Sequence, residues 1–229
     1  MEGITVPLAL QDYMTVIFSA LGLSILTRMV YQMDRNLGRM ALIGTIVTVL
    51  GGTLKASGKL VIALDGPDLA VLNQGLFPLV APGFVLVGWS LYQIRRFFRE
   101  QPPLKQPWLV PLLTIGVFAA GSIALGMAGG PWKVPLILLA TIGNVGLLVM
   151  LAVAAFKRRM WFSGSLFVVT LIVVLVMSQL AGIPDMPISV IWFEQIAQTI
   201  AQMLFTLAAW NYSQVIETTY GRRLAVQPA

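Results

Sequence analysis

The sequence predicts an all-α integral membrane protein, a single transmembrane domain of about seven helices over residues 1–229. Three observations predict this fold: the composition, a series of apolar segments and the placement of the basic residues. Hydrophobic residues make up 58% of the chain and charged residues 10%, whereas soluble domains contain roughly 45–50% and 25%. Because one membrane crossing needs about 20 apolar residues, this length holds about seven crossings with short connections.

The apolar segments follow one another along the chain, separated by charged or turn-forming residues. Each segment is long enough for one crossing of the hydrocarbon core. The predicted spans are 10–31, 39–63, 70–94, 107–128, 133–156, 161–181 and 189–215. All six tryptophans fall near the ends of these spans, where an apolar ring with a polar N–H suits the headgroup region. The tryptophans therefore support the boundaries independently.

The basic residues collect in alternate connections between the spans. Twelve of the 15 lie around the first, third and fifth connections and in the tail. They are Arg28, Arg35 and Arg39, then Arg95, Arg96, Arg99 and Lys105, then Lys157, Arg158 and Arg159, and finally Arg222 and Arg223. The positive-inside rule predicts an outside N-terminus and a cytoplasmic C-terminus, which we expect in the cell (inner) membrane. Topology alone explains these loops, and anionic lipid is a further expected partner.

Several function classes are excluded by the residues that the chain lacks. It contains no cysteine and no histidine, so disulfides, thiolate nucleophiles, His-ligated haem and the commonest zinc sites are ruled out. No nucleophile–base pair, phosphate-binding glycine loop or intramembrane carboxylate pair is visible. We therefore expect no enzymatic activity, no metal centre and no nucleic-acid partner. No feature identifies a cofactor, and pigment or lipid binding through amide or backbone oxygens stays open.

The third and seventh predicted spans resemble each other. When they are aligned, Phe84 falls on Phe205 and Trp89 on Trp210. This match predicts a 3+1+3 arrangement of two parallel repeats joined by the fourth span, with chance similarity between apolar segments as the alternative. The layout is similar to that of SWEET-type sugar transporters. The similarity is one of helix number and orientation, because the chain lacks a proline–glutamine loop motif. A retinal protein is set aside, because 189–215 contains no lysine.

Two further patterns concern helix packing. The fourth predicted span has a small residue at every fourth position, Gly116, Ala120, Ala124 and Ala128. This ridge predicts a packed helix that is central or links the repeats, and the alternative is that the span faces lipid. Pro78 and Pro82 interrupt the third span. They predict a kink, which is either a static bend or a hinge.

Two lysines lie inside the second predicted span. Lys55 and Lys59 are four residues apart and share one helix face. A lysine at the centre of a membrane helix costs about 2.5–3.5 kcal/mol on insertion scales, so an intramembrane lysine indicates a functional site by default. The alternative is structural: Lys59 forms a salt bridge with Glu194 at a similar depth, or the lysines extend outward to water.

The last predicted span carries amide side chains on one face. Gln195, Gln198 and Gln202 follow the spacing of a helix face, and amides that face lipid cost several kcal/mol each. Asn73 and Gln74 open the third span at the same depth. The predicted ligand-binding residues are Lys55, Lys59, Asn73, Gln74, Glu194, Gln195, Gln198 and Gln202.

Two functions are compatible with these patterns. The first is a membrane carrier or sensor that binds a small polar or anionic molecule in an outward-facing cavity between the second, third and seventh spans. The alternative is a non-catalytic accessory subunit, whose amide face and small-residue ridge contact other membrane subunits. The lipid bilayer is an expected partner in both cases.

Overall fold

The computed structural model describes residues 5–97, 101, 104–180 and 187–226. The described residues form helices and no strands. The helices are α1 (Val6–Met33), α2 (Arg35–Ala63), α3 (Ala70–Gln74), α4 (Leu76–Phe97), α5 (Leu109–Met127), α6 (Lys133–Lys157), α7 (Trp161–Leu180) and α8 (Ile188–Val226). Each predicted span corresponds to one helix except the third, which is divided.

The division of the third span lies at Gly75, between α3 and α4. Proline has no N–H, and its ring clashes with the carbonyl group four residues earlier. Pro78 therefore cannot continue the hydrogen-bond ladder back to Gln74, and the break appears one turn before it. Pro82 is accommodated within α4.

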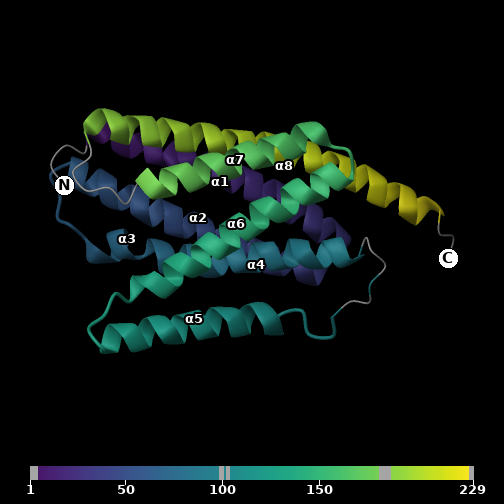
Figure 1. The fold of residues 1–229 in the computed structure, drawn as a ribbon, viewed down its shortest axis with the longest axis horizontal. Helices are drawn as coiled ribbons and strands as arrows, with labels where there is room; N and C mark the ends of the chain where they lie inside the picture. The colour runs from purple at the N-terminus through teal and green to yellow at the C-terminus, as the bar shows by residue number, and fades with distance from the viewer. Residues whose placement is uncertain (1–4, 98–100, 102–103, 181–186, 227–229) are drawn as a thin grey trace.

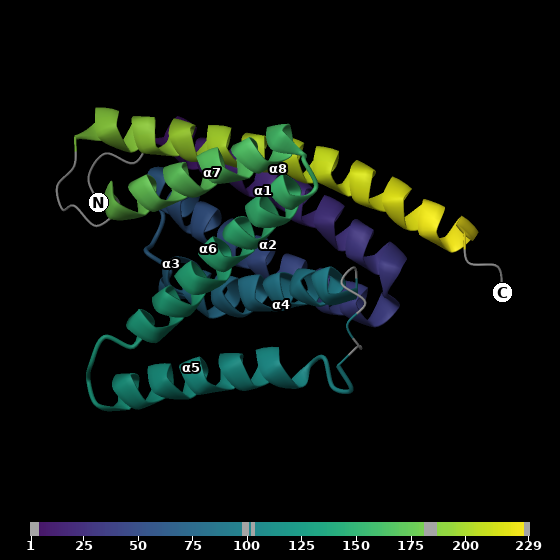
Figure 2. The same ribbon diagram turned by 45° about the vertical axis from the view of Figure 1, so that its right-hand side comes forward.

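Six helices pack in a closed ring. Following the contacts, α1 packs against α2, α2 against α4, α4 against α6, α6 against α7, α7 against α8, and α8 against α1 (Figures 1 and 2). The first and last long helices are thus neighbours. Helix α1 also touches α4, so the ring is narrow across this direction.

The order of helices in the ring bears on the predicted repeat. The first three long helices (α1, α2, α4) and the last three (α6, α7, α8) form two consecutive arcs. The arcs meet where α4 packs against α6 and where α8 packs against α1. If the arcs are exchanged, so that α4 takes the place of α8 and α6 that of α1, each of these contacts becomes the other. This order is the one that a parallel repeat would produce, and the repeat itself stays a prediction.

Helix α5 lies at the edge of the bundle, not in its centre. It packs against α6 and α4 and stands apart from the ring (Figures 1 and 2). Only Pro111 and Ser122 of α5 are buried, and a Cβ atom added at Gly116 would meet no atom within 4 Å. The expectation of a packed central helix is therefore wrong. Helix α5 links the two arcs from outside, and its small-residue ridge is uncovered in the isolated chain.

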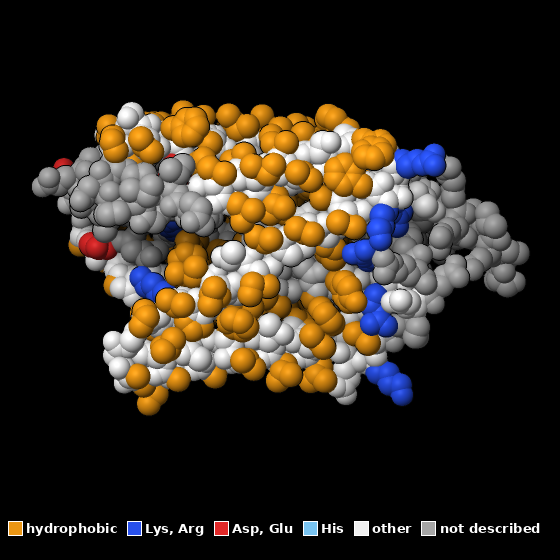
Figure 3. Space-filling model, viewed as in Figure 1, with side chains coloured by type: hydrophobic (Ala, Val, Ile, Leu, Met, Phe, Trp, Pro, Cys, Tyr) orange, Lys and Arg blue, Asp and Glu red, His pale blue; other side chains and the backbone are white. Residues whose placement is uncertain are grey.

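The surface of the bundle is that of a membrane protein. Among the described residues, five helical segments are long and apolar enough to cross a membrane: α1, α2, the α3–α4 segment, α5 and α6. Large apolar side chains are exposed on their outer faces, for example Ile46 on α2 and Leu113 on α5, far more than a soluble monomer tolerates. Figure 3 shows hydrophobic side chains over the middle of the molecule and most of the visible Lys and Arg side chains at one end. These features indicate an integral membrane protein.

The two ends of the bundle differ in charge. We call the end where α4 and α6 terminate, with Arg95 and Lys157, the basic end. The other end of the bundle, where α1 and α8 begin, is called the opposite end. Helix α8 has 39 residues, about 58 Å at 1.5 Å per residue, whereas the hydrocarbon core is about 30 Å thick. It accordingly projects beyond the other helices at the basic end (Figures 1 and 2).

The ring interior is filled with apolar side chains from all six helices. We call these residues the apolar layer; they include Leu26, Ala41, Leu91, Leu151, Phe167 and Phe205. The Phe167 ring contacts Phe205 and Tyr212 edge-on, with ring centroids 6.1 and 6.2 Å apart, a favourable geometry for aromatic pairs. The apolar layer separates the polar groups of the opposite end from the basic end.

Helices α2 and α4 approach each other closely through glycines. A Cβ atom at Gly44 would lie 2.7 Å from the Gly83 carbonyl oxygen, and one at Gly51 would lie 2.8 Å from Val80. A Cβ atom at Gly83 would overlap the Thr48 hydroxyl and lie 2.7 Å from the Gly44 carbonyl oxygen. Small residues allow this approach, and packing of this kind drives helix association in membranes.

We expect Gly83→Ala to destabilise the protein, because the added methyl group has no space against α2. Overpacking of this kind costs about 1–3 kcal/mol. Gly116→Ala is the matched control: it makes the same change in helix propensity, worth about 1 kcal/mol in favour of alanine, at a site with open space. The measurement is the apparent Tm of each purified variant in detergent. Equal Tm values for the two variants would contradict the close α2–α4 contact.

Candidate functional site

The polar residues of the opposite end are organised around one ion pair. Lys59 Nζ of α2 lies 2.5 Å from Asp12 Oδ2 of α1. The two side chains are only 21% and 12% exposed, so the pair is largely shielded from water. Lys59 thus pairs with Asp12 and not with Glu194, the partner predicted from depth alone. The structural interpretation of Lys59 is supported, with a different carboxylate.

Helix α1 carries polar contacts on both of its sides at this end. Toward α2, the Tyr13 and Ser57 hydroxyls are 2.7 Å apart. Toward α8, Gln11 donates to the Thr199 hydroxyl at 3.0 Å, and the Thr15 hydroxyl lies 2.8 Å from the same oxygen. Helix α1 therefore joins α2 to α8 through hydrogen bonds and an ion pair.

Lys55 faces the interior of the ring. On α2, Gly51 packs against Val80 of α4, whereas Gly52 packs against Val16 of α1. At about 100° per residue, Lys55 falls between these two directions, which is the side of α2 that faces inward. Its side chain is nevertheless exposed. It interacts electrostatically with Lys59, Asp12 and Glu194, so it belongs to the same polar cluster.

Helix α8 presents a polar row to the same interior. Thr206 of α8 donates to the Phe18 carbonyl of α1, and the Ala201 carbonyl accepts from Thr170 of α7. These contacts fix the directions of the two neighbouring helices. Glu194, Gln198 and Gln202 are spaced four apart and fall between those directions. The row therefore points into the ring from α8, as Lys55 does from α2.

Two members of the polar row of α8 form a hydrogen bond with each other. Gln198 Nε2 donates to Glu194 Oε1 at 3.0 Å, and the Glu194 side chain is buried. Gln195, on the side toward α1, is also buried, and its Oε1 atom has no hydrogen-bond partner within the described residues. Such a group is expected to find a partner in water or a ligand.

The structure places most of the predicted site residues at the same end of the bundle, but other helices surround them than the prediction named. Lys55, Lys59, Glu194, Gln195, Gln198 and Gln202 lie at the opposite end. The site lies around α1, which stands between α2 and α8, and not simply between the second, third and seventh spans. Gln74 is exposed at the end of α3, and the Asn73 side chain lies outside the described part of the structure.

Sequence reasoning missed the contribution of α1, namely Gln11, Asp12, Tyr13 and Thr15. The apolar run predicts a span that begins at residue 10, which places Asp12 at the very start of that span. A local signal was present: Pro7 lies in the first turn of α1, which begins at Val6 after Thr5. Proline is favoured in the first turn of a helix, so it could have moved the start of the helix back and placed Asp12 at the depth of Lys59.

The formal charges of this cluster balance. Lys55 and Lys59 are matched by Asp12 and Glu194, and all four interact electrostatically. The interior therefore offers one ammonium group, one carboxylate and several amides to a bound molecule. It can donate and accept hydrogen bonds without a net charge to compensate.

Comparison with known proteins gives no family assignment. No protein-family model matches the chain, and the searches of curated proteins and solved structures gave no significant match.

We expect Asp12→Asn to destabilise the protein, because it leaves the Lys59 charge without its partner. The loss should stay below the roughly 3–5 kcal/mol typical of a broken, fully buried pair, since both side chains retain some exposure. The double variant Asp12→Asn/Lys59→Gln removes both charges and should recover part of the loss. The apparent Tm in detergent is the measurement. Additive effects of the two substitutions would mean that the ion pair does not couple α1 to α2.

Proposed function

We propose that this chain is a multi-pass membrane carrier or sensor for a small polar molecule, bound in the ring interior at the opposite end. By the positive-inside rule this end faces the outside, and the basic end faces the cytoplasm. The observation that carries the proposal is the shared orientation of Lys55 and the Glu194–Gln198–Gln202 row. The Lys55 side chain from α2 and the row from α8 both face the interior of the ring.

The charge balance favours a neutral or zwitterionic ligand over a strongly anionic one. Each lysine of the cluster has a carboxylate within electrostatic range, so an additional anion would have to compete with Glu194 and Asp12 for the ammonium groups. A polyhydroxyl or zwitterionic molecule would use both Lys55 and Glu194. The amides of Gln198 and Gln202 supply directional donors and acceptors, as in other small-molecule sites.

The apolar layer favours a carrier or sensor over an open pore. Phe167 and Phe205 are fully or almost fully buried, and with the rest of the apolar layer they separate the polar row from the basic end within the described residues. Passage would require the two arcs of the ring to move relative to each other, as in alternating access. A sensor would need no passage, only a change in packing upon binding.

One observation favours the alternative of an accessory subunit. Helix α5 lies outside the ring with its small-residue ridge uncovered, and such ridges are where transmembrane helices associate. In that case the polar cluster holds α1, α2 and α8 together, and α5 contacts another subunit.

We expect Lys55→Ala to abolish ligand binding and leave the yield of folded protein nearly unchanged, because Lys55 faces the interior and forms no salt bridge with any residue that the structure describes. The probes are glucose, sucrose, glycine and glutamine, with phosphate and citrate as anionic comparisons. A ligand at 100 times its Kd stabilises the folded state by about 2.7 kcal/mol, which raises the apparent Tm of the purified protein.

Lys133→Ala is the matched control, because Lys133 lies at the same end, at the start of α6 and beside Trp132. Stabilisation by a neutral or zwitterionic compound that survives in Lys133→Ala and disappears in Lys55→Ala supports the proposal. Equal responses of wild type and Lys55→Ala would remove Lys55 from the site. Stabilisation by the anions alone would contradict the charge-balance argument. Co-purification with other subunits, with a complex yield that falls in Lys55→Ala, would support the accessory role.

A further inference from the structure

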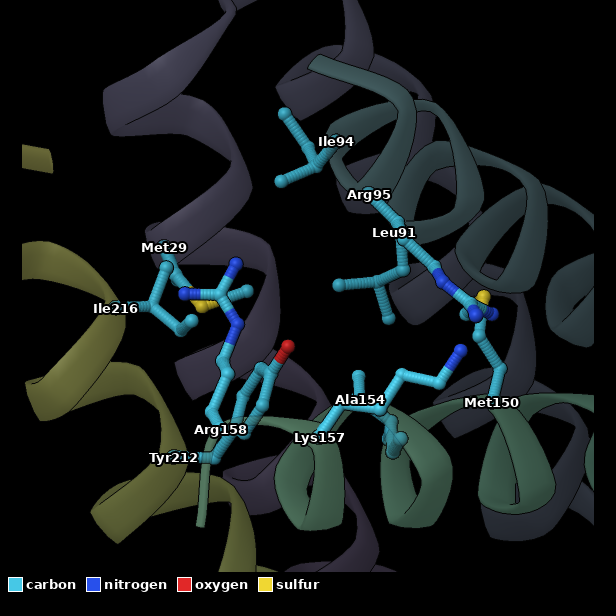
Figure 4. Close-up of a pocket in the computed structure, with 11 residues that line it drawn as sticks. Met29, Leu91, Ile94, Arg95, Met150, Ala154, Lys157, Arg158, Tyr212 and Ile216 are labelled. Atoms are coloured by element: carbon cyan, nitrogen blue, oxygen red, sulfur yellow. The ribbon is translucent and has the colours of Figure 1, made fainter. Parts of the chain in front are cut away.

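A second cavity lies at the basic end, on the other side of the apolar layer. Its volume is about 160 Å³. Side chains from α1, α4, α6 and α8 and from the turn after α6 surround it (Figure 4). It lies at the end of the same ring interior as the polar cluster, but its chemistry is different.

The cavity is lined by cations. Arg95, Lys157 and Arg158 belong to its wall, and none of its lining residues is acidic. Figure 4 shows the Tyr212 hydroxyl pointing into the space between these side chains. Arg95 and Lys157 lie in the last turns of α4 and α6, where each helix end contributes roughly half a negative charge. The described wall of the cavity therefore contains cationic groups and a hydroxyl but no carboxylate.

The positive-inside rule does not explain this convergence. It requires basic residues on the cytoplasmic side, and side chains such as Arg35 and Arg39 meet that requirement without lining the cavity. Arg95, Lys157 and Arg158 instead come from two sides of one cavity. An anionic group bound there would contact cations from both sides of the cavity.

The remaining walls of the cavity are apolar. They comprise Met29, Leu91, Ile94, Met150, Leu151, Ala154 and Ile216. Methionine side chains adapt to irregular apolar ligands, and two of them lie here. A hydrated inorganic anion would gain nothing from this surface, whereas the first part of a hydrocarbon chain would.

We propose that this cavity binds an anionic amphiphile, a molecule with a phosphate or carboxylate group on an acyl chain. Arg95, Lys157 and Arg158 hold the anionic group and the Tyr212 hydroxyl donates to it. The start of the chain packs against Met29 and Met150. At about 160 Å³ the cavity is smaller than the roughly 300–1,000 Å³ of drug-sized sites, so the rest of the chain leaves between the helices into the bilayer. This site is independent of the one at the opposite end.

The test is native mass spectrometry of the purified full chain in detergent. The probes are oleate, 1-oleoyl lysophosphatidate, 1-oleoyl lysophosphatidylcholine and glycerol 3-phosphate, each titrated separately. Wild type should bind one molecule of lysophosphatidate or oleate, and the stronger of the two identifies the head group as phosphate or carboxylate. Lysophosphatidylcholine, with no net charge, and glycerol 3-phosphate, with no chain, should each bind at least about tenfold more weakly.

Two variants separate the contributions of the head group and the chain. Lys157→Gln/Arg158→Gln removes two cations, and Ala154→Leu fills part of the apolar wall; both should weaken binding by about tenfold or more. Arg35→Gln/Arg39→Gln is the matched control, with the same charge change outside the cavity, and should bind as wild type does. The proposal is overturned if Lys157→Gln/Arg158→Gln and the control bind equally. It is also overturned if lysophosphatidylcholine binds as tightly as lysophosphatidate, or if glycerol 3-phosphate alone binds as tightly as either amphiphile.

Discussion

The structure depends on one constraint: polar groups within the hydrocarbon core must be paired or enclosed, because lipid offers them no hydrogen bonds. Helix α8 carries Glu194, Gln198 and Gln202 along one face. This face is enclosed because α1 lies beside α8 and is fixed to it by the contacts of Gln11 and Thr15 with Thr199. With α1 in place, the chain closes into a ring and the polar row faces its interior.

The ring gives the molecule two chemically different ends separated by an apolar layer. At the opposite end, Lys55 and the α8 row form a balanced polar interior. At the basic end, Arg95, Lys157 and Arg158 surround a cavity without acidic residues. Between them Phe167 packs edge-on against Phe205 and Tyr212. A ligand at one end and an amphiphile at the other would each act on the packing of this layer, which provides a physical route for coupling.

The bounds of the helices could be predicted from the sequence, whereas the helices that pack against one another could not. Spans are set by continuous apolar runs, so their bounds follow from local composition, and the break near Pro78 follows from its missing N–H. Partners depend on the ring order, which no local pattern contains. Lys59 was therefore matched with Glu194, while Asp12 of α1 forms the pair. The small-residue ridge of α5 predicted a packed helix, but the ridge is uncovered within the chain, because small residues show that close packing is sterically possible and not that a neighbour is present.

The most direct test of this account is the water accessibility of the α8 row, measured in a chain that has no cysteine of its own. Gln198→Cys and Ile200→Cys would each be treated with a charged, membrane-impermeant thiosulfonate added from outside. Gln198 faces the ring interior, whereas Ile200 is 48% exposed on the outer surface, where lipid would keep its thiol protonated and out of reach. The account predicts rapid labelling of Gln198→Cys and little of Ile200→Cys. Labelling of Ile200→Cys with Gln198→Cys protected would contradict the polar interior.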